Sequence, residues 1–449
     1  MLRVVIFVGI VFTFVAAASA QTDNKTFNQF RGPDGSGVVA DQSIPVTWSE
    51  DANVAWKVPI EGGGWSQPVI QQDRIYVTTS VSDTGIKPKS FASGVRTPAS
   101  MGLGTKAPKT TMQWRVVCLN LKDGSKIWEK DIAQGQPKFG VHPSNSFATE
   151  TPVVDQDGVY VYFGMSGTIA ALSLDGKIKW QNDVGVYKTS NDFGTGSSLA
   201  IHKGKVLLQQ FNETHAKAFC FDTKTGNEIW KAEFDQKGTA WSTPIVWKNK
   251  NRTEVVISSN RAVESFDPET GKQLWRVGNV LAASAASVCF NENAIFFGNS
   301  SPMAKGPLFA VSAGATGDVS PEKRNDQFEN CLWAQPRSGP GIVSPVATKD
   351  FVYVVDGSVL KCFDAATGES RYKERLPGLK SMAASPLIVG NKLILIDDAG
   401  TACVVATGAE FRVLGKGKLN DVFWSSPAVS DNAIFIRGVD SLYCLRAAE

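Results

Sequence analysis

The chain has 449 residues, of which 43% are hydrophobic and 20% charged, so it can bury a large core and does not have the composition of a disordered chain. Its formal net charge of +3 and its three histidines argue against a basic nucleic-acid-binding surface and against a histidine-rich metal centre. The 41 glycines, 12 tryptophans and 25 phenylalanines favour many short strands joined by tight turns, which is typical of an all-β fold.

The first twenty residues have the pattern of a secretory signal peptide. Residues 1–3 form a basic start, residues 4–15 are apolar, and small residues precede an expected cleavage site near Ala20. No cysteine lies near this site, and no later apolar run reaches the roughly 18 residues that a membrane-spanning helix needs. We therefore expect a soluble periplasmic or secreted protein without a transmembrane segment. Residues 21–52 are expected to form an N-terminal extension ahead of the repeats.

A repeated phrase with an Asp-Gly or Thr-Gly turn at its centre occupies the rest of the chain. Clear copies are CLNLKDGSKIW at 118–128, ALSLDGKIKW at 171–180, CFDTKTGNEIW at 220–230, SFDPETGKQLW at 265–275 and CFDAATGESRY at 362–372, and degenerate copies lie at 310–318 and 403–411. The turn glycines, 40 to 52 residues apart, are Gly124, Gly176, Gly226, Gly271, Gly317, Gly368 and Gly408. A period of this length with flanking strands is typical of four-stranded propeller blades.

A second landmark, a small residue followed by proline and apolar residues, marks the inner strand of each blade. It occurs at SQPVI, TETPVV, WSTPIV, VSPVA, AASPLIV and SSPAV, with GSSLAI and AASVCF in the third and fifth units. The strand that follows alternates, as in GVYVYF at 158–163 and KLILID at 392–397, and this period of two predicts a half-buried strand. The landmarks together predict eight blades.

The eighth unit ends at SLYCLRAAE, one strand short of a complete blade. The segment NVAWKVPI at 53–60 resembles an outer strand and precedes the first inner strand. Its pairing with the last blade would close the ring and remove an exposed sheet edge. The sequence therefore predicts an all-β, eight-bladed propeller of four-stranded antiparallel blades over residues 53–449, closed by an N-terminal outer strand.

Two insertions interrupt the period. Residues 81–113 in the first blade lack periodicity and are predicted to form a long loop, and a shorter insertion at 318–330 falls in the fifth blade. Such loops either cover a functional site or are disordered, and both interpretations stay open.

The seven cysteines are interpreted mainly as free, buried thiols. Cys118, Cys220 and Cys362 occupy one slot of the repeat, and Cys403 and Cys444 lie in the equivalent strand, too far apart for disulfide geometry. A bridge between Cys289 and Cys331 stays open.

The repeat resembles the blade signature of the pyrroloquinoline quinone (PQQ) propeller superfamily. Matching residues are Cys220, Asp222, Thr225, Gly226 and Trp230, and again Ser265, Asp267, Thr270, Gly271 and Trp275. The phrase FNQFRGPDGSG at 27–37 resembles exported bacterial proteins described as PQQ-binding-like. The superfamily contains quinoprotein dehydrogenases and non-catalytic, BamB-like assembly proteins, so the resemblance implies a fold strongly and a function weakly.

The resemblance to the dehydrogenases implies adjacent cysteines, a calcium ion and an aspartate base, but no two cysteines are adjacent here. We therefore expect an exported, non-catalytic binding or assembly scaffold, monomeric, without a cofactor, whose partner is a cell-envelope protein or a small ligand and not nucleic acid. The alternative is a PQQ- and calcium-dependent dehydrogenase with its site at the mouth of the central channel. Carbohydrate binding by tryptophans at the mouth is a third interpretation.

Candidate site residues follow from their place in the repeat. The inner strands of a propeller line its central channel, so the residues just before the proline landmark and the loops that lead into it should converge on one mouth. The expected ligand-binding residues are Trp65, Ser66, His142, Asn145, Glu150, Asn191, Asp192, Trp241, Arg337 and Trp424. Glu150, Asn191 or Asp192 would be the calcium ligands of the alternative function. The competing interpretation is that these residues simply fill or hydrate the channel.

Overall fold

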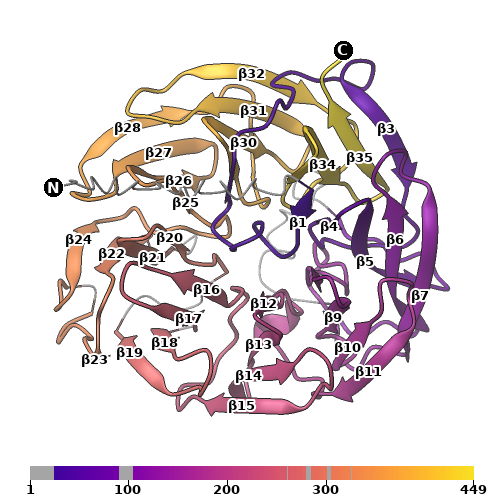
Figure 1. Ribbon diagram of the computed structural model, residues 1–449, viewed down its shortest axis with the longest axis horizontal. Helices are drawn as coiled ribbons and strands as arrows, with labels where there is room; N and C mark the ends of the chain where they lie inside the picture. Colours follow the sequence, from indigo (N-terminus) through magenta and orange to yellow (C-terminus); the bar gives the residue numbers. More distant parts are fainter. Residues whose placement is uncertain are drawn as a thin grey trace, which may run out of the picture.

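The computed structural model describes residues 25–89, 105–259, 261–279, 285–300, 305–324 and 326–448. The expected signal peptide at 1–20 and the centre of the first insertion lie outside these ranges. The described chain forms eight antiparallel sheets arranged around a central axis, so the predicted eight-bladed β-propeller is confirmed (Figure 1). Among the described residues, no helix has the length and apolar character needed to cross a membrane.

Each blade has four strands in order from the axis to the rim. The first four blades contain β4 (Val69–Gln71), β5 (Arg74–Ser82), β6 (Met112–Asn120) and β7 (Lys126–Gly135); β8 (Val153–Val154), β9 (Val159–Phe163), β10 (Thr168–Leu172) and β11 (Ile178–Asp183); β12 (Ala200–His202), β13 (Lys205–Phe211), β14 (Ala216–Asp222) and β15 (Glu228–Glu233); and β16 (Ile245–Lys248), β17 (Thr253–Ser258), β18 (Val263–Phe266) and β19 (Gln273–Val277).

The last four blades follow the same plan. They contain β20 (Cys289–Phe290), β21 (Ala294–Ser300), β22 (Lys305–Ser312) and β24 (Cys331–Gln335); β25 (Val346–Ala347), β26 (Phe351–Asp356), β27 (Val359–Asp364) and β28 (Ser370–Arg375); β29 (Leu387–Val389), β30 (Lys392–Ile396), β31 (Thr401–Ala406) and β32 (Val413–Lys418); and β33 (Ala428–Ser430), β34 (Ala433–Arg437), β35 (Ser441–Arg446) and β3 (Val54–Pro59). Three short strands, β1 (Thr26–Phe27), β2 (Val38–Val39) and β23 (Gly317–Asp318), add to the edges of the first, seventh and fourth blades.

The ring closes where the sequence predicted. Strand β3 pairs antiparallel with β35, and Trp56 lies opposite Cys444. The last blade thereby combines the two ends of the propeller chain, and β35 is not left as an exposed edge.

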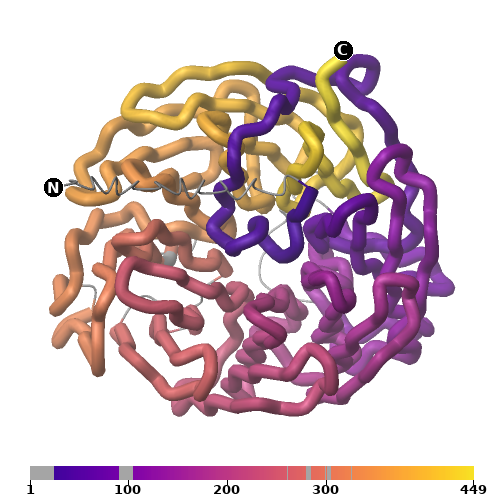
Figure 2. Tube along the Cα trace, in the orientation of Figure 1, coloured from indigo at the N-terminus to yellow at the C-terminus, as the bar shows by residue number. Residues whose placement is uncertain are grey.

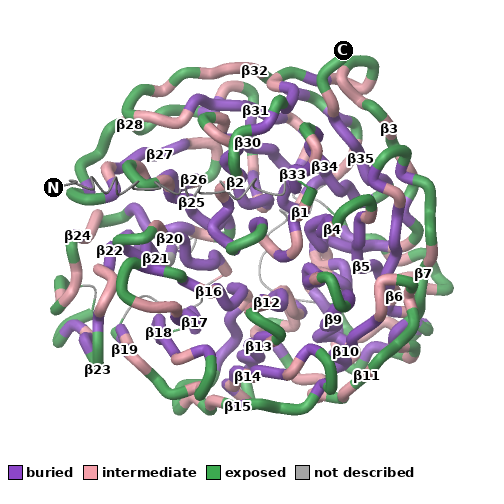
Figure 3. The backbone as a smooth tube through the Cα atoms, in the orientation of Figure 1, coloured by how far each residue is buried: buried purple, intermediate pink, exposed green. Residues whose placement is uncertain are grey.

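The core lies between neighbouring blades rather than at the axis. Every residue of β9 and β10 is buried, whereas outer strands such as β3 alternate between exposed and partly buried residues (Figure 3). The prediction that the alternating second strands are half-buried is therefore wrong. These strands have another blade against each face, so both sets of their alternating side chains are covered.

At five joints, a tryptophan on the outer strand of one blade packs against the turn glycine of the next. A Cβ atom at Gly226 would lie 2.6 Å from Cδ2 of Trp180, and the indole Nε1 of Trp180 donates to the carbonyl of Thr223 at 2.9 Å. Equivalent pairs are Trp56 with Gly124, Trp128 with Gly176, Trp230 with Gly271 and Trp333 with Gly368. The turn glycine thus serves two purposes, because its φ is positive and its missing side chain admits the indole ring.

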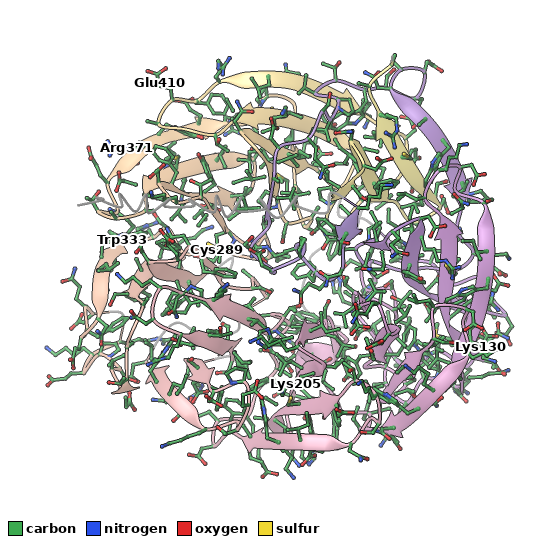
Figure 4. The ribbon with its side chains drawn as sticks, in the orientation of Figure 1. Lys130, Lys205, Cys289, Trp333, Arg371 and Glu410 are labelled. Carbon is green, nitrogen blue, oxygen red and sulfur yellow. The ribbon has the colours of Figure 1, made fainter. Side chains whose placement is uncertain are left out.

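The joint between the fourth and fifth blades departs from this pattern. Gly317 has the expected positive φ of 72°, but it lies in β23, which pairs in parallel with β19 of the preceding blade, and not in a hairpin turn as predicted. Trp275 there donates to the buried carboxylate of Glu254 at 2.6 Å. The insertion displaces the outer strand of the fifth blade to β24, which carries Trp333 (Figure 4).

The first insertion is shorter than predicted, because β5 extends to Ser82 and β6 begins at Met112. The prediction of free thiols is confirmed: all seven cysteines are free and six are buried. Four of them lie opposite the aromatic residue of the neighbouring strand, in the pairs Cys118 with Trp128, Cys220 with Trp230, Cys362 with Tyr372 and Cys444 with Trp56.

Candidate functional site

A ring of hydroxyl groups surrounds the channel where the inner strands begin. The backbone N–H of the residue at each landmark position donates to the hydroxyl of the equivalent residue in the next blade, through seven hydrogen bonds of 2.8–3.1 Å. The hydroxyls belong to Thr151, Ser198, Thr243, Ser287, Ser344, Ser385 and Ser426. The small residue of the landmark is therefore a hydroxyl that links two blades, and a proline after it leaves no unpaired N–H beside the channel.

Gln67 occupies the corresponding position of the first blade. Its Nε2 donates to the carbonyl of Pro427 in the eighth blade at 2.6 Å, and its Oε1 accepts the backbone N–H of Arg31 at 2.8 Å. The longer side chain therefore connects the first and last blades and also holds the N-terminal extension.

That extension covers one end of the channel. The segment from Phe27 to Gly37 crosses the centre of the disc before the chain runs to the rim and enters β3 (Figure 2). Its hydrogen bonds reach the inner strands of six blades: β1 pairs with β4, Val154 donates to Asn28, Ile201 donates to Gln29, Arg31 donates to Val288 and to Pro345, and Ile388 donates to Gly37. The phrase FNQFRGPDGSG is thus a plug for the channel.

Arg31 is the centre of this plug and is 1% exposed. Its guanidinium donates to three backbone carbonyls, those of Ser36, Val288 and Pro345. Burial lowers the pKa of Arg31 from its usual value, and Asp34 nearby opposes this shift. The carbonyl contacts replace the hydration that the buried cation has lost.

The expected mouth lies at the opposite end of the channel. The plug contacts Ile70, Val154, Ile201 and Ile388, each three residues downstream of the ring, whereas the loops that lead into the inner strands lie upstream of it. We call these the incoming loops.

Six of the expected site residues lie on connected incoming loops. Trp65 stacks on Trp424 with ring centroids 5.9 Å apart, and its Nε1 donates to the carbonyl of Ser144 at 2.6 Å. His142 meets the edge of Phe193 at 5.3 Å, and Phe193 lies 6.1 Å from Trp241. The Trp65–Trp424 pair and the row of His142, Phe193 and Trp241 are connected through Ser144, which bonds to both Trp65 and His142. We call these five rings, contributed by the eighth, first, second, third and fourth blades, the aromatic wall.

Polar groups fix this wall in place. Asn145 Nδ2 donates to the carbonyls of Phe193 at 3.2 Å and Thr195 at 2.9 Å, and Trp241 Nε1 donates to Gly194 at 2.8 Å. Ser66 is fully buried and its hydroxyl accepts from the guanidinium of Arg437 at 3.0 Å. These side chains use their hydrogen-bonding groups to hold neighbouring loops together.

Three expected site residues are not joined to the wall by the described contacts. Asn191 is exposed with a φ of 52°, and the carboxylate of Asp192 lies 3.5 Å from Lys188; both belong to the short 3-10 turn η2 (Ser190–Asp192). Arg337 is exposed, and its carbonyl accepts from Lys361 at 3.2 Å. The assignment of these residues to a ligand site stays a prediction.

A cavity of about 20 Å³ lies beside Glu150, between the second and third blades. Residues that line it include Tyr162, Tyr187, Thr195, Ser197, Gln209, Asn212 and Trp241. Glu150 is 1% exposed, and its Oε1 accepts the N–H of Gly164, another lining residue, at 3.2 Å. Burial raises the pKa of Glu150 to about 7, although hydrogen bonding from Thr195 and backbone amides opposes the shift.

Four residues of the cavity and the wall were not among the expected site residues, namely Phe193, Ser197, Gln209 and Asn212. Gln209 lies in β13, outside the incoming loops, so the address within the repeat did not select it. The available signal was the pair of glutamines in KVLLQQF, which is otherwise an apolar buried strand.

The described flanks of the first insertion lie beside the incoming loop of the second blade. Lys89 donates to the carbonyl of Pro143 and Thr105 donates to that of Val141, both at 2.9 Å. Nearby, a groove of about 700 Å³ runs between β3 and the outer strands of the first blade. Its charges are mutually paired, since Arg115 bridges Glu61 and Glu129, and Lys87 pairs with Asp440.

Comparison with known proteins covers the whole propeller. A family model described as the outer membrane protein assembly factor BamB matches residues 53–261, 165–320 and 261–449. No curated protein sequence matches the chain significantly.

Solved structures share the architecture at low sequence identity. BamB from Moraxella catarrhalis is 13% identical with a TM-score of 0.54, over 88% of this chain and 97% of the other. The quinohemoprotein alcohol dehydrogenase from Comamonas testosteroni is 11% identical with a TM-score of 0.63, over 95% and 82% of the two chains. Sqt1 from Saccharomyces cerevisiae is 11% identical with a TM-score of 0.52, over 91% and 100%. At these identities the likeness concerns the fold alone.

Proposed function

The chain belongs to the family of the outer membrane protein assembly factor BamB, and on that premise we propose that it is an exported, non-catalytic scaffold that docks a cell-envelope partner at the mouth of its propeller. The observation that carries this proposal is that side chains at the mouth are held in place by hydrogen bonds. The side-chain N–H groups of Trp65, Asn145 and Trp241 donate to backbone carbonyls of neighbouring loops. A preorganised surface of this kind loses little conformational freedom when a partner binds.

The half-buried aromatic residues of the wall supply the contact area. His142, Phe193 and Trp241 form a row across three blades, and aromatic side chains are enriched among residues that dominate interface energies. The plug closes the opposite end of the channel, so the mouth is the side at which the channel is available to a partner.

The alternative, a PQQ- and calcium-dependent dehydrogenase, finds weaker support in the donor groups. Calcium takes about six to eight oxygen ligands. Glu150 is buried, but Asn191 is exposed and Asp192 faces Lys188, so the three expected ligands do not converge. In the described part of the chain, no group of three or more histidine, cysteine, aspartate or glutamate side chains is arranged to hold a metal. The residues present do not fit that cofactor pair.

The test is a deletion of the gene in the producing bacterium, with the abundance of outer membrane β-barrel proteins as the readout. We expect the deletion to lower their abundance and the unaltered gene to restore it. A His142→Ala/Phe193→Ala double variant should fail to restore it, because two rings of the wall are lost. A matched Ile229→Ala control on the outer edge, where Ile229 is 42% exposed, should restore it fully.

Both variant proteins must show the thermal midpoint of the unaltered protein, so that a failure reports docking rather than folding. Unchanged levels of β-barrel proteins in the deletion strain would contradict the proposal.

A further inference from the structure

The residues that face the mouth can be identified from the hydroxyl ring. In every blade the residue just before the ring position is buried, whereas the residue two positions before it is at least partly exposed in seven of the eight blades. We call these eight residues the facing positions. The four small ones are Thr149, Gly196, Ala285 and Ala383. The four large ones are all apolar, namely Trp65, Trp241, Ile342 and Trp424.

Facing positions of neighbouring blades lie side by side around the opening. Trp65 stacks on Trp424, with ring centroids 5.9 Å apart. A Cβ atom at Gly196 would lie 3.4 Å from Cδ1 of Trp241 and 3.6 Å from Cγ2 of Thr149. The eighth blade is thereby linked to the first, and the third to the second and fourth. None of the eight residues is charged, so the centre of the mouth is neutral and largely apolar.

Ile342 is the most exposed facing position. Its exposed fraction is 48%, and it belongs to the sixth blade, which does not contribute to the aromatic wall. Its loop is held in place, because Ser300 donates its backbone N–H to the carbonyl of Pro340 and its hydroxyl to that of Gly339, both at 2.7 Å. A single exposed isoleucine needs no explanation, but this one shares its position in the repeat with three tryptophans. A partner that covers it removes apolar surface from water.

Basic side chains surround this neutral centre. The incoming loops of the second, fourth, sixth and seventh blades each carry one exposed cation, and in the described chain none of these four lies at salt-bridge distance from a carboxylate. The four residues are Lys138, Lys237, Arg337 and Lys380.

The acidic side chains of the incoming loops are mostly engaged already. Glu61 and Asp192 each lie within 3.5 Å of a basic nitrogen, and Asp421 accepts backbone N–H groups at 2.7–3.3 Å. Glu150 is buried. In the described loops, Asp235 is then the exposed carboxylate without such a contact. The margin of the mouth therefore carries an excess of unpaired positive charge, which favours a partner of opposite charge.

We propose that the mouth docks an acidic protein segment. An apolar side chain of the segment packs at the centre against Ile342 and the facing tryptophans, and its carboxylates approach Arg337 and Lys380 at the margin. This inference rests on the proposed docking function and names the chemistry of the partner. It also assigns a role in recognition to the sixth and seventh blades, which lie outside the aromatic wall.

The test is photo-crosslinking in the producing bacterium. The photoreactive residue p-benzoylphenylalanine is placed at position 342 of the full-length protein, and the crosslinked peptides are identified by mass spectrometry. We expect a crosslink to an envelope protein, at a segment in which aspartate or glutamate flanks an apolar residue. The matched control is position 332, because Leu332 is also 48% exposed but lies on the outer strand β24, where no crosslink to that segment should form.

Substitutions then test the two parts of the surface. With the photoreactive residue at 342, Arg337→Glu should lower the crosslink yield by at least about threefold, because an attraction becomes a repulsion. Lys373→Glu on the outer strand β28 should leave the yield unchanged. Ile342→Asp should fail to restore β-barrel proteins in the deletion strain, whereas Leu332→Asp should restore them. All variants must keep the thermal midpoint of the unaltered protein.

A crosslink from position 342 to a basic segment, to lipid or to glycan, or no crosslink at all, would overturn the proposal. So would full restoration by Ile342→Asp. The two proposals fail separately. The expected crosslink without any loss of β-barrel proteins in the deletion strain would refute the assembly function alone, and such a loss without a crosslink at 342 would refute this inference alone.

Discussion

Replacement of the turn glycine at one blade joint separates its two roles. Gly226 has a φ of 73°, and a Cβ atom there would lie 2.6 Å from the ring of Trp180. In Gly226→Ala, the left-handed backbone costs about 1–2 kcal/mol, and the crowded ring adds about 1–3 kcal/mol. Gly317 has nearly the same φ, 72°, but nothing within 4 Å of its Cβ position. Gly317→Ala should therefore cost only about 1–2 kcal/mol.

The assay is equilibrium denaturation of the mature protein and of these variants, together with Trp180→Ala and the double variant Trp180→Ala/Gly226→Ala. In the Trp180→Ala background, the alanine at position 226 should cost no more than Gly317→Ala does, which gives a coupling energy of about 1–3 kcal/mol between the two sites. Equal costs of Gly226→Ala and Gly317→Ala in the unaltered background would refute the reasoning, as would a Gly226→Ala cost that Trp180→Ala leaves unchanged.

Three further outcomes follow from buried polar groups and thiols. Burial raises the pKa of Glu150 from 4.5 to about 7, so the native state binds the proton more tightly than the unfolded state, and the stability of the unaltered protein falls as the pH rises between these values. Glu150→Gln removes this loss, and its stability relative to the unaltered protein should rise by about 3 kcal/mol above pH 7. Parallel pH profiles of the two proteins in chemical denaturation would contradict this. Gln67→Ala leaves the Arg31 amide and the Pro427 carbonyl unpaired and should lower the free energy of unfolding by about 1–3 kcal/mol, whereas an unchanged denaturation midpoint would show that Gln67 does not close the ring. A thiol-specific colorimetric reagent should react slowly with the native protein, because burial raises the pKa of thiols such as Cys118, in that case to about 12. After unfolding without reductant, the reagent should titrate all seven cysteines, and a count of five thiols would reveal a disulfide.

Most of the fold could be predicted from the repeat. Five clear phrases, the proline landmark and the aromatic segment around Trp56 sufficed to predict eight blades and their closure, because each blade repeats the same local turn and pairing. Trp333 was not predicted as the aromatic residue of an outer strand, because the insertion separates it from the preceding turn. Gly317 was predicted to lie in a hairpin only because its neighbours in the sequence resemble the repeated phrase. Whether a strand is covered on one face or two depends on the neighbouring blades, so the alternation within β9 could not show that it is fully buried.

The candidate site was less accessible to sequence reasoning. Position within the repeat placed Trp65, His142, Trp241 and Trp424 at the mouth. The hydroxyl ring could not be recognised, because each hydrogen bond joins two residues more than forty positions apart. The role of FNQFRGPDGSG was also hidden, since it occurs once and has no partner in the repeat.

Binding of the quinone tests the claim of a non-catalytic scaffold most directly. Thermal unfolding of the mature protein is followed during titration with PQQ, with and without calcium. A ligand at 100 times its dissociation constant adds about 2.7 kcal/mol to the stability of the native state, which is readily detected. A non-catalytic scaffold should show no saturable stabilisation under either condition. A saturable, calcium-dependent rise in the unfolding temperature would contradict it and would make Glu150 the first residue to replace in a search for dehydrogenase activity.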